Sequence, residues 1–425
     1  MSRIIIAWGL WGPYHRCRFE AFRDHAAREG HQVTGVSLFS GSRDYQWLSG
    51  NLPEGVVHFN LGKDETILPL AKIGHLLAIP RKLRTEVALL PSYFNWSLAL
   101  NTSMRLYGGR VVMMNETHAG TVRARGLKAA FKQRVVAGFH AGFVGGEPQR
   151  RYFASLGLPG EKIFTGYDAV DNELFASKSA DIRSRQSEVR KQYQLPKKYF
   201  LNLGRFVPKK NLSILIQAYR KVLDSSRDCQ THLVMVGSGE EDPKLRMLCQ
   251  ELKLPVYDKT ALKTGTTDHG SQTPDPNPGV HFYGFRQIEE NPVFYALADA
   301  FVLPSLWEEW GLVVNEAMAC GLPVVVSETA GCAEDLLGRD RLATPPGLTA
   351  DLRLRLAQLT GRIRENGFLF SPNSVQSLAD ALIILEAVPE LRGNMGQASR
   401  SIVEKFSCAN FARNALCAAR AALGN

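Results

Sequence analysis

The stretch AFVLPSLWEEWGLVVNEAMACGLPVVVS, residues 300–327, contains a short apolar run, a polar loop, a helical pattern and a second apolar run. AFVLPS and LPVVVS have the length and apolar character of buried strands. LVVNEAMAC has the apolar spacing of a buried helix. The order strand, helix, strand predicts two parallel strands joined by a crossover helix.

The same alternation runs through the rest of the chain, in two series. Buried strands are predicted at residues 3–8, 32–39, 87–92, 110–115 and 141–146, and again at 199–204, 232–237, 280–285, 300–305 and 322–327. Helical patterns such as 20–30 and 126–136 lie between strands. This rhythm predicts an α/β fold of two doubly wound domains, each a parallel sheet with helices on both faces.

The length of 425 residues exceeds what one ordinary core needs and suits two domains. A polar segment, residues 176–198, separates the two strand series, so the domains are predicted to join there. Residues 1–175 form the first predicted domain and residues 176–400 the second. Residues 257–279 and 338–366 are predicted surface insertions, the first with little regular structure and the second with a basic helical segment.

The composition, 45% hydrophobic and 22% charged, indicates a globular protein. The net charge of +10 favours a polyanionic partner, which could be nucleic acid, an anionic membrane surface or a phosphorylated small molecule; a solvated basic surface has the same charge. No helix-turn-helix or aromatic RNA-binding signature supports nucleic acid. The N-terminus lacks a signal-peptide pattern, no apolar run reaches the length of a membrane span, and the seven cysteines are scattered. A cytoplasmic protein with reduced thiols is therefore predicted.

Ligands of doubly wound sheets bind beyond the carboxyl ends of the strands, where loops carry the chemistry. One such loop holds Gly204 and Arg205 and leads through Lys210 into a helix, whose N-terminus attracts anions. These residues predict a diphosphate site, and a loop with solvated charges is the alternative. Gly237 follows another strand, but Asp242 replaces the third glycine of a dinucleotide motif. Read alone, Gly237 belongs to a structural turn.

Two glutamates flank the turn before the apolar helix of the opening stretch. Glu308 lies in the loop after a strand, and Glu316 lies inside the helix. A buried carboxylate without partners costs several kcal/mol, so Glu316 needs hydrogen-bond donors. The vicinal hydroxyls of a ribose could supply them, as could a neighbouring loop or a local arginine.

Six segments in order resemble the donor half of retaining family-4 glycosyltransferases of the GT-B fold: GRFVPKKN, VGSGE, HFYGF, the double-glutamate segment, TAGCAED and NGFLF. That family carries two glutamates separated by seven residues. Its signature aligns without gaps with Ser305, Glu308, Gly311, Leu312, Glu316 and the run AMACG at 317–321. The resemblance implies two Rossmann-like domains facing across a cleft, an acceptor-binding domain first and a donor-binding domain second. It also implies that a C-terminal helix at 401–425 crosses back to the first domain.

The resemblance assigns roles to single residues. Arg205 and Lys210 would bind the donor diphosphate, Glu316 the ribose and Glu308 the transferred sugar. The implied donor-binding set is Gly204, Arg205, Lys210, Gly237, Phe285, Arg286, Glu308, Gly311, Leu312, Glu316 and Gly331, in which the backbone at 285 and 286 would face the nucleobase. The implied catalytic set is Glu308, Arg205, Lys210 and His118.

The sequence departs from the family pattern close to these residues. Glu309 and Trp310 stand where the family usually has glycine and phenylalanine, Ala330 replaces one glycine of a pair, and Asn211 replaces the glycine after the lysine. The charged groups are kept, so these departures leave the identity of the sugar open. Glu309 and Trp310 are the predicted positions for an unusual donor sugar.

The first half matches the family more weakly, and its predicted acceptor-binding residues are Gly9, Gly12, Arg16, Arg18, Glu116 and His118. Arg16 and Arg18 could meet an acceptor phosphate or form surface charge at a helix start. His118, at a strand end, could touch the donor sugar as in the family or play a structural role. The segment 163–175, with Asp171 and Phe175, resembles the interdomain segment of the family.

Residues 66–84 and 122–134 mix apolar and basic side chains. Such segments are typical of membrane-surface enzymes and also of buried helices with a solvated edge. Peripheral contact with the inner face of an anionic membrane, and a lipid-linked acceptor, are predicted.

The resemblance therefore predicts a retaining glycosyltransferase that moves a sugar from a UDP- or GDP-type donor to a glycan or lipid-linked acceptor, in cell-surface polysaccharide or glycolipid synthesis. No metal and no other cofactor is expected, because Arg205, Lys210 and a helix N-terminus can stabilise the leaving group and no Asp-x-Asp motif accompanies the donor segments. A sugar phosphorylase or nucleotide-sugar epimerase of the same fold, or a non-catalytic sugar-nucleotide-binding protein, is the alternative.

Overall fold

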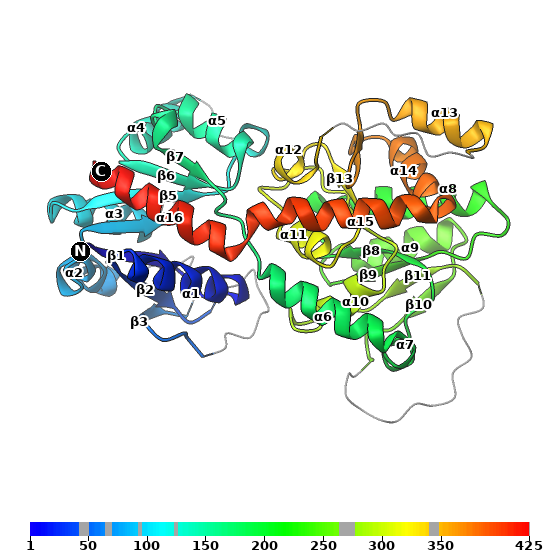
Figure 1. The fold of residues 1–425 in the computed structure, drawn as a ribbon, viewed down its shortest axis with the longest axis horizontal. Coiled ribbons are helices and arrows are strands. Elements are labelled where there is room, and N and C mark those ends of the chain that lie inside the picture. Colours follow the sequence, from blue (N-terminus) through cyan, green and yellow to red (C-terminus); the bar gives the residue numbers. More distant parts are fainter. Residues whose placement is uncertain are drawn as a thin grey trace. The chain divides into compact units, whose positions relative to one another are not determined.

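The computed structural model describes residues 1–41, 51–63, 70–91, 96–122, 126–262, 277–339 and 348–424. The chain divides into two compact units (Figure 1). The N-terminal unit comprises Met1–Asp171 together with Lys405–Asn425, and the C-terminal unit comprises Asn172–Glu404. These limits lie within a few residues of the predicted limits at 175 and 400.

The N-terminal unit is built on a seven-stranded parallel sheet in the order β3-β2-β1-β4-β5-β6-β7. Its strands are β1 (Arg3–Trp8), β2 (Gln32–Phe39), β3 (Val56–Gly62), β4 (Val87–Leu90), β5 (Arg110–Asn115), β6 (Ala141–Val144) and β7 (Ile163–Thr165). The chain winds outward from β1 in one direction and then returns to β4 and winds in the other. Loops that follow β1 and β4 therefore diverge at the carboxyl edge, where such sheets bind ligands.

Both faces of this sheet are buried, which explains the continuous apolar runs of its strands. Along β1, Ile4 and Ile6 pack on one face and Ile5 and Ala7 on the other, because successive side chains of a strand point to opposite sides. The covering helices are α1 (Pro13–Arg28), α2 (Ile73–Lys82), α3 (Trp96–Leu106), α4 (Leu127–Val136), α5 (Glu147–Ser155) and α16 (Cys408–Leu423), with 3₁₀ turns η1 (Leu70–Lys72), η2 (Ala119–Thr121) and η3 (Gly160–Lys162).

The last helix, α16, packs beside α1 in the N-terminal unit although it follows the whole C-terminal unit in sequence (Figure 1). Its buried face includes Phe411, Ala415 and Leu416, which join the core formed by β1 and α1. The chain therefore crosses twice between the units, near residue 171 and near residue 404.

The C-terminal unit has an eight-stranded sheet in the order β10-β11-β9-β8-β12-β13-β15-β14, parallel except for β14. Its strands are β8 (Tyr199–Leu203), β9 (His232–Val236), β10 (Val256–Asp258), β11 (Val280–Phe282), β12 (Ala300–Leu303), β13 (Val324–Ser327), β14 (Ile363–Arg364) and β15 (Gly367–Phe370). Its helices are α6 (Asn172–Ser184), α7 (Gln186–Tyr193), α8 (Leu212–Ser225), α9 (Asp242–Glu251), α10 (Asn291–Ala296), α11 (Leu312–Ala319), α12 (Ala333–Leu336), α13 (Ala350–Gln358), α14 (Val375–Ala387) and α15 (Pro389–Val403), with η4 (Pro208–Lys210) and η5 (Glu404–Phe406).

The predicted α/β class and all ten predicted strands are confirmed. The boundary between the units lies at residue 171, a few residues before the polar segment 176–198 where the domains were predicted to join. That segment consists mostly of α6 and α7, which bury Ile182 and Val189. Many charged residues lie between the few apolar side chains of this segment, so its sequence shows no clear helical pattern. In the first predicted insertion β10 overlaps its start, and residues 263–276 lie outside the described residues, as do 340–347 of the second.

All seven cysteines are free thiols. Among the helices within the described ranges, none combines the length and apolarity that crossing a membrane requires.

Candidate active site

The loop after β8 carries the predicted diphosphate residues. The strand β8 is fully buried and ends at Leu203, next to Gly204. Arg205 is exposed, and η4 ends at Lys210, two residues before the start of α8. This loop lies beside the loop after β9, because the Gly204 N–H donates to Val236 O at 2.9 Å and the Phe206 N–H donates to Ser238 O at 2.8 Å. The structure therefore places the basic residues at the carboxyl edge of the sheet, as the sequence predicted.

Gly237 is required by the packing of these two loops. Its φ is +143°, and a Cβ atom there would lie 1.8 Å from the carbonyl oxygen of Gly204. A backbone oxygen cannot move aside as a side chain can, so only glycine fits. The Gly237 N–H donates to Gly284 O at 2.8 Å, which brings the loop after β11 to the same edge. In that loop Arg286 donates from Nη2 to Lys259 O at 3.2 Å.

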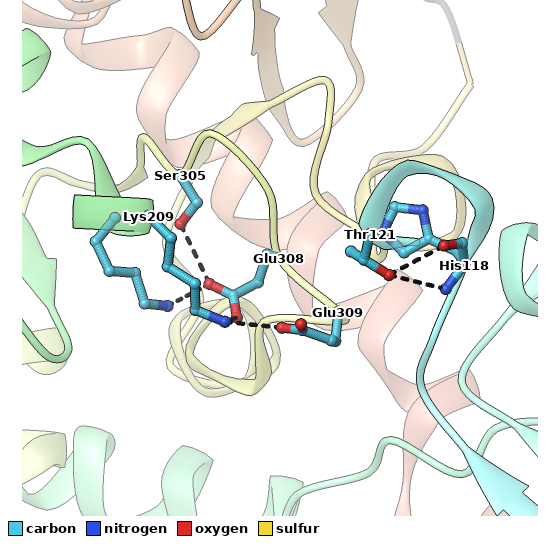
Figure 2. A network of polar contacts seen from close by, with 7 residues as sticks. His118, Thr121, Lys209, Ser305, Glu308 and Glu309 are labelled. Carbon is cyan, nitrogen blue, oxygen red and sulfur yellow. Dashed lines mark hydrogen bonds and ion pairs between the residues drawn. The ribbon is translucent and has the colours of Figure 1, made fainter. Parts of the chain in front are cut away.

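Glu308 lies at the centre of a charged cluster in the loop after β12 (Figure 2). One carboxylate oxygen accepts hydrogen bonds from Lys210 Nζ and, at 3.2 Å, from Ser305 Oγ. The other lies 3.5 Å from Lys209 Nζ. Burial by itself raises the pKa of Glu308, but the charges of Lys210 and Lys209 outweigh burial and hold that pKa below its ordinary value.

Sheet order explains why lysines and a glutamate about 100 residues apart meet. Strands β8 and β12 are hydrogen-bonded neighbours, so the loops that follow them emerge side by side. The Leu306 N–H donates to Lys209 O at 2.8 Å and ties the two loops together. Lys209 was not predicted as a site residue, although its position next to Lys210 in the sequence indicates it.

The predicted glycine loop at 329–335 holds the main chain of Glu308 in place. The Gly331 N–H donates to Glu308 O at 2.9 Å, and Glu308 forms an isolated parallel bridge with Ala330. Thr329 Oγ1 also donates to Ser305 O at 3.3 Å. The structure thus brings Gly331 next to Glu308, and the predicted approach of this loop to a donor remains a prediction.

Gly311 and Leu312 form the turn into α11. Gly311 has φ +109°, and a Cβ atom there would lie 3.0 Å from a Leu303 methyl group. Trp310 precedes it with only 1% of its surface exposed, and its indole N–H donates to Asn315 Oδ1 at 2.9 Å. Trp310 therefore fills the interior beneath α11, so a role in the choice of donor sugar, which remains a prediction, would be indirect.

Glu309, the other predicted position for sugar selectivity, differs from Trp310. Its side chain is 40% exposed and pairs with Lys209 at 2.8 Å (Figure 2). The glutamate that replaces the usual glycine is therefore part of the charged cluster.

Glu316 is fully buried in α11 and has donors from within the protein. The Tyr295 hydroxyl donates to Glu316 Oε2 at 2.8 Å, and Asn291 Nδ2 lies 3.5 Å from the same oxygen. Both partners belong to α10, and neither was among the donors considered from the sequence. The need for donors is thus no longer an argument for a ribose, and the ribose contact remains a prediction.

In the N-terminal unit, Gly9 and Gly12 shape the loop after β1. Gly9 O accepts the N–H groups of Leu38 and Phe39, at 3.2 and 2.9 Å. Gly12 caps α1, and its N–H donates to His15 Nδ1 at 2.9 Å. Both glycines therefore have structural roles here, and their predicted contact with an acceptor remains a prediction.

Arg16 and Arg18 lie on different sides of α1, because two residues correspond to about 200° of helical rotation. Arg16 is exposed and pairs with Glu20 at 3.3 Å. Arg18 is 1% exposed; its Nε donates to Ala169 O at 2.8 Å and its guanidinium lies 3.7 Å from Asp168 Oδ1. The expectation that Arg18 forms surface charge is therefore wrong, because its side chain is buried, and its contact with an acceptor phosphate remains a prediction.

Glu116 lies beside this buried arginine. It is partly buried, and its charge acts on Asp168. Burial, and then the charge of Glu116, raise the pKa of Asp168 well above its usual range.

His118 begins the short turn η2 and is 8% exposed. Its Nδ1 accepts the Gly120 N–H at 3.3 Å. The backbone N–H of His118 lies 3.3 Å from Thr121 Oγ1 (Figure 2). This capping role is structural, and contact with a donor sugar remains a prediction.

No group of three or more His, Cys, Asp or Glu side chains placed to hold a metal ion occurs in the part of the chain that the structure describes.

Comparison with known proteins identifies the domain that carries this cluster. The family model for glycosyl transferases group 1 matches residues 197–387. This segment is a group 1 glycosyltransferase domain. It contains every donor-binding residue predicted above.

Two curated relatives match the glycosyltransferase domain and its surroundings. Mannosylfructose-phosphate synthase of Agrobacterium fabrum is 28% identical over 209 residues, 48% of this chain and 41% of the relative. O-antigen chain mannosyltransferase B of Escherichia coli is 30% identical over 194 residues, 45% of this chain and 44% of the relative. The chain thus matches less than half the length of either.

Solved structures match the whole chain. Sucrose-phosphate synthase from Thermosynechococcus elongatus has a TM-score of 0.67 at 18% identity, covering 100% of both chains. A glycosyltransferase from Rickettsia africae has a TM-score of 0.69 at 14% identity, covering 100% of this chain and 99% of that one. At these identities the similarity establishes the fold, and the predicted GT-B class with two Rossmann-like domains is confirmed.

Proposed function

We propose that the chain is a retaining glycosyltransferase that transfers a sugar from a UDP- or GDP-type donor to a glycan or lipid-linked acceptor. The observation that carries the proposal is the buried Glu308, held between two lysines at the carboxyl edge of the group 1 domain. A solved Anabaena protein of the same fold, HepE, is described in complex with UDP and glucose, with a TM-score of 0.64 and 16% identity over 98% of both chains.

The charges of the cluster suit a diphosphate leaving group. Arg205 and Lys210 stand before α8, whose N-terminus adds a partial positive charge. Fixed cations of this kind stabilise the negative charge that develops as the bond to the sugar breaks, and they can do so without a metal ion. In binding the diphosphate, Lys210 would release Glu308 toward the transferred sugar.

Retention follows if attack and departure occur on the same face of the sugar. The acceptor oxygen forms a bond to the anomeric carbon while the bond from that carbon to the phosphate oxygen breaks. The acceptor proton passes to the departing phosphate oxygen, so no further base is needed. Glu308 would then stabilise positive charge on the sugar rather than attack it.

A panel of nucleotides and nucleotide sugars, scored by thermal shift and by calorimetry, tests the donor site. We expect UDP or GDP to bind, and Lys210→Ala to weaken the diphosphate far more than the matching nucleoside. Equal losses for the two ligands would remove the diphosphate role of Lys210. Proton NMR of the first product would show the anomeric configuration, and inversion would refute the retaining mechanism.

The N-terminal unit offers a surface for a lipid-linked acceptor. On α4, Leu127 is 90% exposed and Phe131 is 56% exposed, four residues apart on one face. Lys128 and Arg134 are also exposed on this helix. Exposed apolar side chains among cations fit an anionic membrane surface, so the proposed setting is peripheral contact at the inner face and synthesis of a cell-surface glycan or glycolipid.

Liposome flotation tests this setting. The double variant Leu127→Ser with Phe131→Ser should lose binding to anionic vesicles, whereas Leu106→Ser, at an 85% exposed position on α3, should not. Absence of wild-type binding to anionic vesicles would refute the membrane contact and leave the donor chemistry standing.

A further inference from the structure

Lys209 lies between two carboxylates of the same loop (Figure 2). Its Nζ is 2.8 Å from Glu309 Oε2 and 3.5 Å from Glu308 Oε1. Lys210 contacts the other oxygen of Glu308. The cluster therefore contains two cations and two anions, and Glu308 is shared between both lysines.

The two lysines differ in how they are held. Lys209 is anchored at both ends, because its carbonyl oxygen accepts the Leu306 N–H and its ammonium group is bound by Glu309. Burial lowers the pKa of Lys209, but the charges of Glu308 and Glu309 outweigh burial and raise it, so this lysine stays protonated. Lys210 is bound to Glu308 and stands at the start of α8, where the proposed diphosphate binds.

Donor binding creates an electrostatic problem for Glu308. When Lys210 turns to the diphosphate, Glu308 loses a cation and gains an anionic neighbour. Its side chain is only 10% exposed, and a buried carboxylate without a counter-charge takes up a proton or costs several kcal/mol. Other groups near Glu308 include the Ser305 hydroxyl and Glu309. Arg205, whose charge acts on Lys209, is also assigned to the diphosphate.

We propose that Lys209, held by Glu309, is the positioning residue that keeps Glu308 ionised and in place while Lys210 binds the donor diphosphate. Glu309 stands where the family pattern has glycine, so the anchor is a feature of this sequence. The inference rests on the proposed donor site and adds to it a role for two residues that the donor assignment leaves without one.

Calorimetric titration with UDP or GDP, whichever the wild type binds, measures the proton count directly. Titrations at about pH 6.5 in two buffers of different ionisation enthalpy give the protons taken up per bound nucleotide. We expect Lys209→Met to take up more protons than the wild type, by an amount approaching one proton per site, because Glu308 then protonates when Lys210 leaves it. The acid limb of the pH profile of nucleotide affinity, which is the pH range where affinity changes on acidification, should shift to higher pH by about 1 to 3 units.

Companion variants separate positioning from loss of charge alone. Lys209→Arg should restore the wild-type proton count, and Glu309→Gln, which frees Lys209 from its anchor, should give a partial increase. Lys221→Met, at an exposed lysine on α8, should match the wild type.

The results distinguish the role of Lys209 from the proposed donor site. Nucleotide binding by Lys209→Met with an unchanged proton count, together with an unchanged acid limb, would overturn the role of Lys209. A wild type that binds no nucleoside diphosphate would overturn the proposed donor site, and the role of Lys209 with it.

Discussion

Replacing Tyr295 with phenylalanine removes one hydroxyl group and leaves the aromatic ring in place. That hydroxyl donates to Glu316 at 2.8 Å, and both side chains are fully buried. The ring itself packs against Phe175 and Phe301, with centroids 6.3 and 5.6 Å away. The variant therefore tests the hydrogen bond to the carboxylate without disturbing the packing around it.

The expected loss follows from the burial of the acceptor. Leaving a buried acceptor without its hydrogen-bond donor costs about 1–3 kcal/mol, and Asn291 at 3.5 Å is too distant to replace the hydroxyl. That range corresponds to an opening equilibrium about 5- to 150-fold more favourable for the segment around α11.

Hydrogen exchange measured by mass spectrometry on the full chain reports this opening. Amides of α11 should exchange faster in Tyr295→Phe by the stated factor, while amides of α16, in the other unit, serve as the internal reference. If Glu316 holds the donor ribose, the variant should also weaken nucleoside binding, because the carboxylate loses a group that orients it.

Exchange in α11 within about 3-fold of the wild type would refute the reasoning, since it would place the bond below about 0.7 kcal/mol. Combining the change with Glu316→Gln provides a further check. The two effects should fall short of additivity if the hydroxyl acts through the carboxylate.

Three other perturbations have definite expected outcomes. Gly237→Ala should destabilise the glycosyltransferase domain by more than about 3 kcal/mol in urea unfolding, because its methyl group would lie 1.8 Å from Gly204 O. Trp310→Phe should cost about 1–3 kcal/mol through the lost bond to Asn315, with no change in the preferred donor sugar, because the indole is buried. Burial, then the charges of neighbouring groups, lowers the pKa of His281 from 6.5 to about 3. The unfolded imidazole therefore binds a proton at a pH where the folded one does not, and stability should fall as pH drops through this window by up to about 1.4 kcal/mol per pH unit. His281→Gln should flatten that fall in acid-unfolding curves.

A control variant tests the result for Gly237→Ala, and a contrary result is defined for each of the three substitutions. Gly393→Ala, in α15 with nothing within 4 Å of the added Cβ atom, should be neutral or slightly stabilising. A similar loss at both glycines would contradict the packing argument for Gly237. A change in sugar preference for Trp310→Phe would show that the indole leaves the interior, and an unchanged acid limb for His281→Gln would show that another group causes the fall.

Much of the fold could be predicted because its signals are local. A parallel strand buried on both faces must be a continuous apolar run, and its crossover must be helical, so the alternation is written into short windows of sequence. Strands that bury few of their side chains, such as β3 and β10, were not predicted. The helices α6 and α7 were not predicted either, because few of their side chains are buried.

The candidate site was predicted in part for the same reason. Arg205, Lys210 and Glu308 stand at strand ends, which the sequence marks, and the family pattern connects them. The burial of Arg18 could not be predicted, because the sequence shows that it follows the start of a helix but not which side of that helix meets the sheet.

Most of the elements, the glycine turns and the charged groups could be inferred from residues close along the chain. Which side chains meet depends on the tertiary structure. Sheet order makes β8 and β12 neighbours and so brings Lys209 to Glu308 and Glu309, and helix packing gives Glu316 the hydroxyl of Tyr295. Such contacts join residues that no sequence window contains, because they arise from the way whole elements pack.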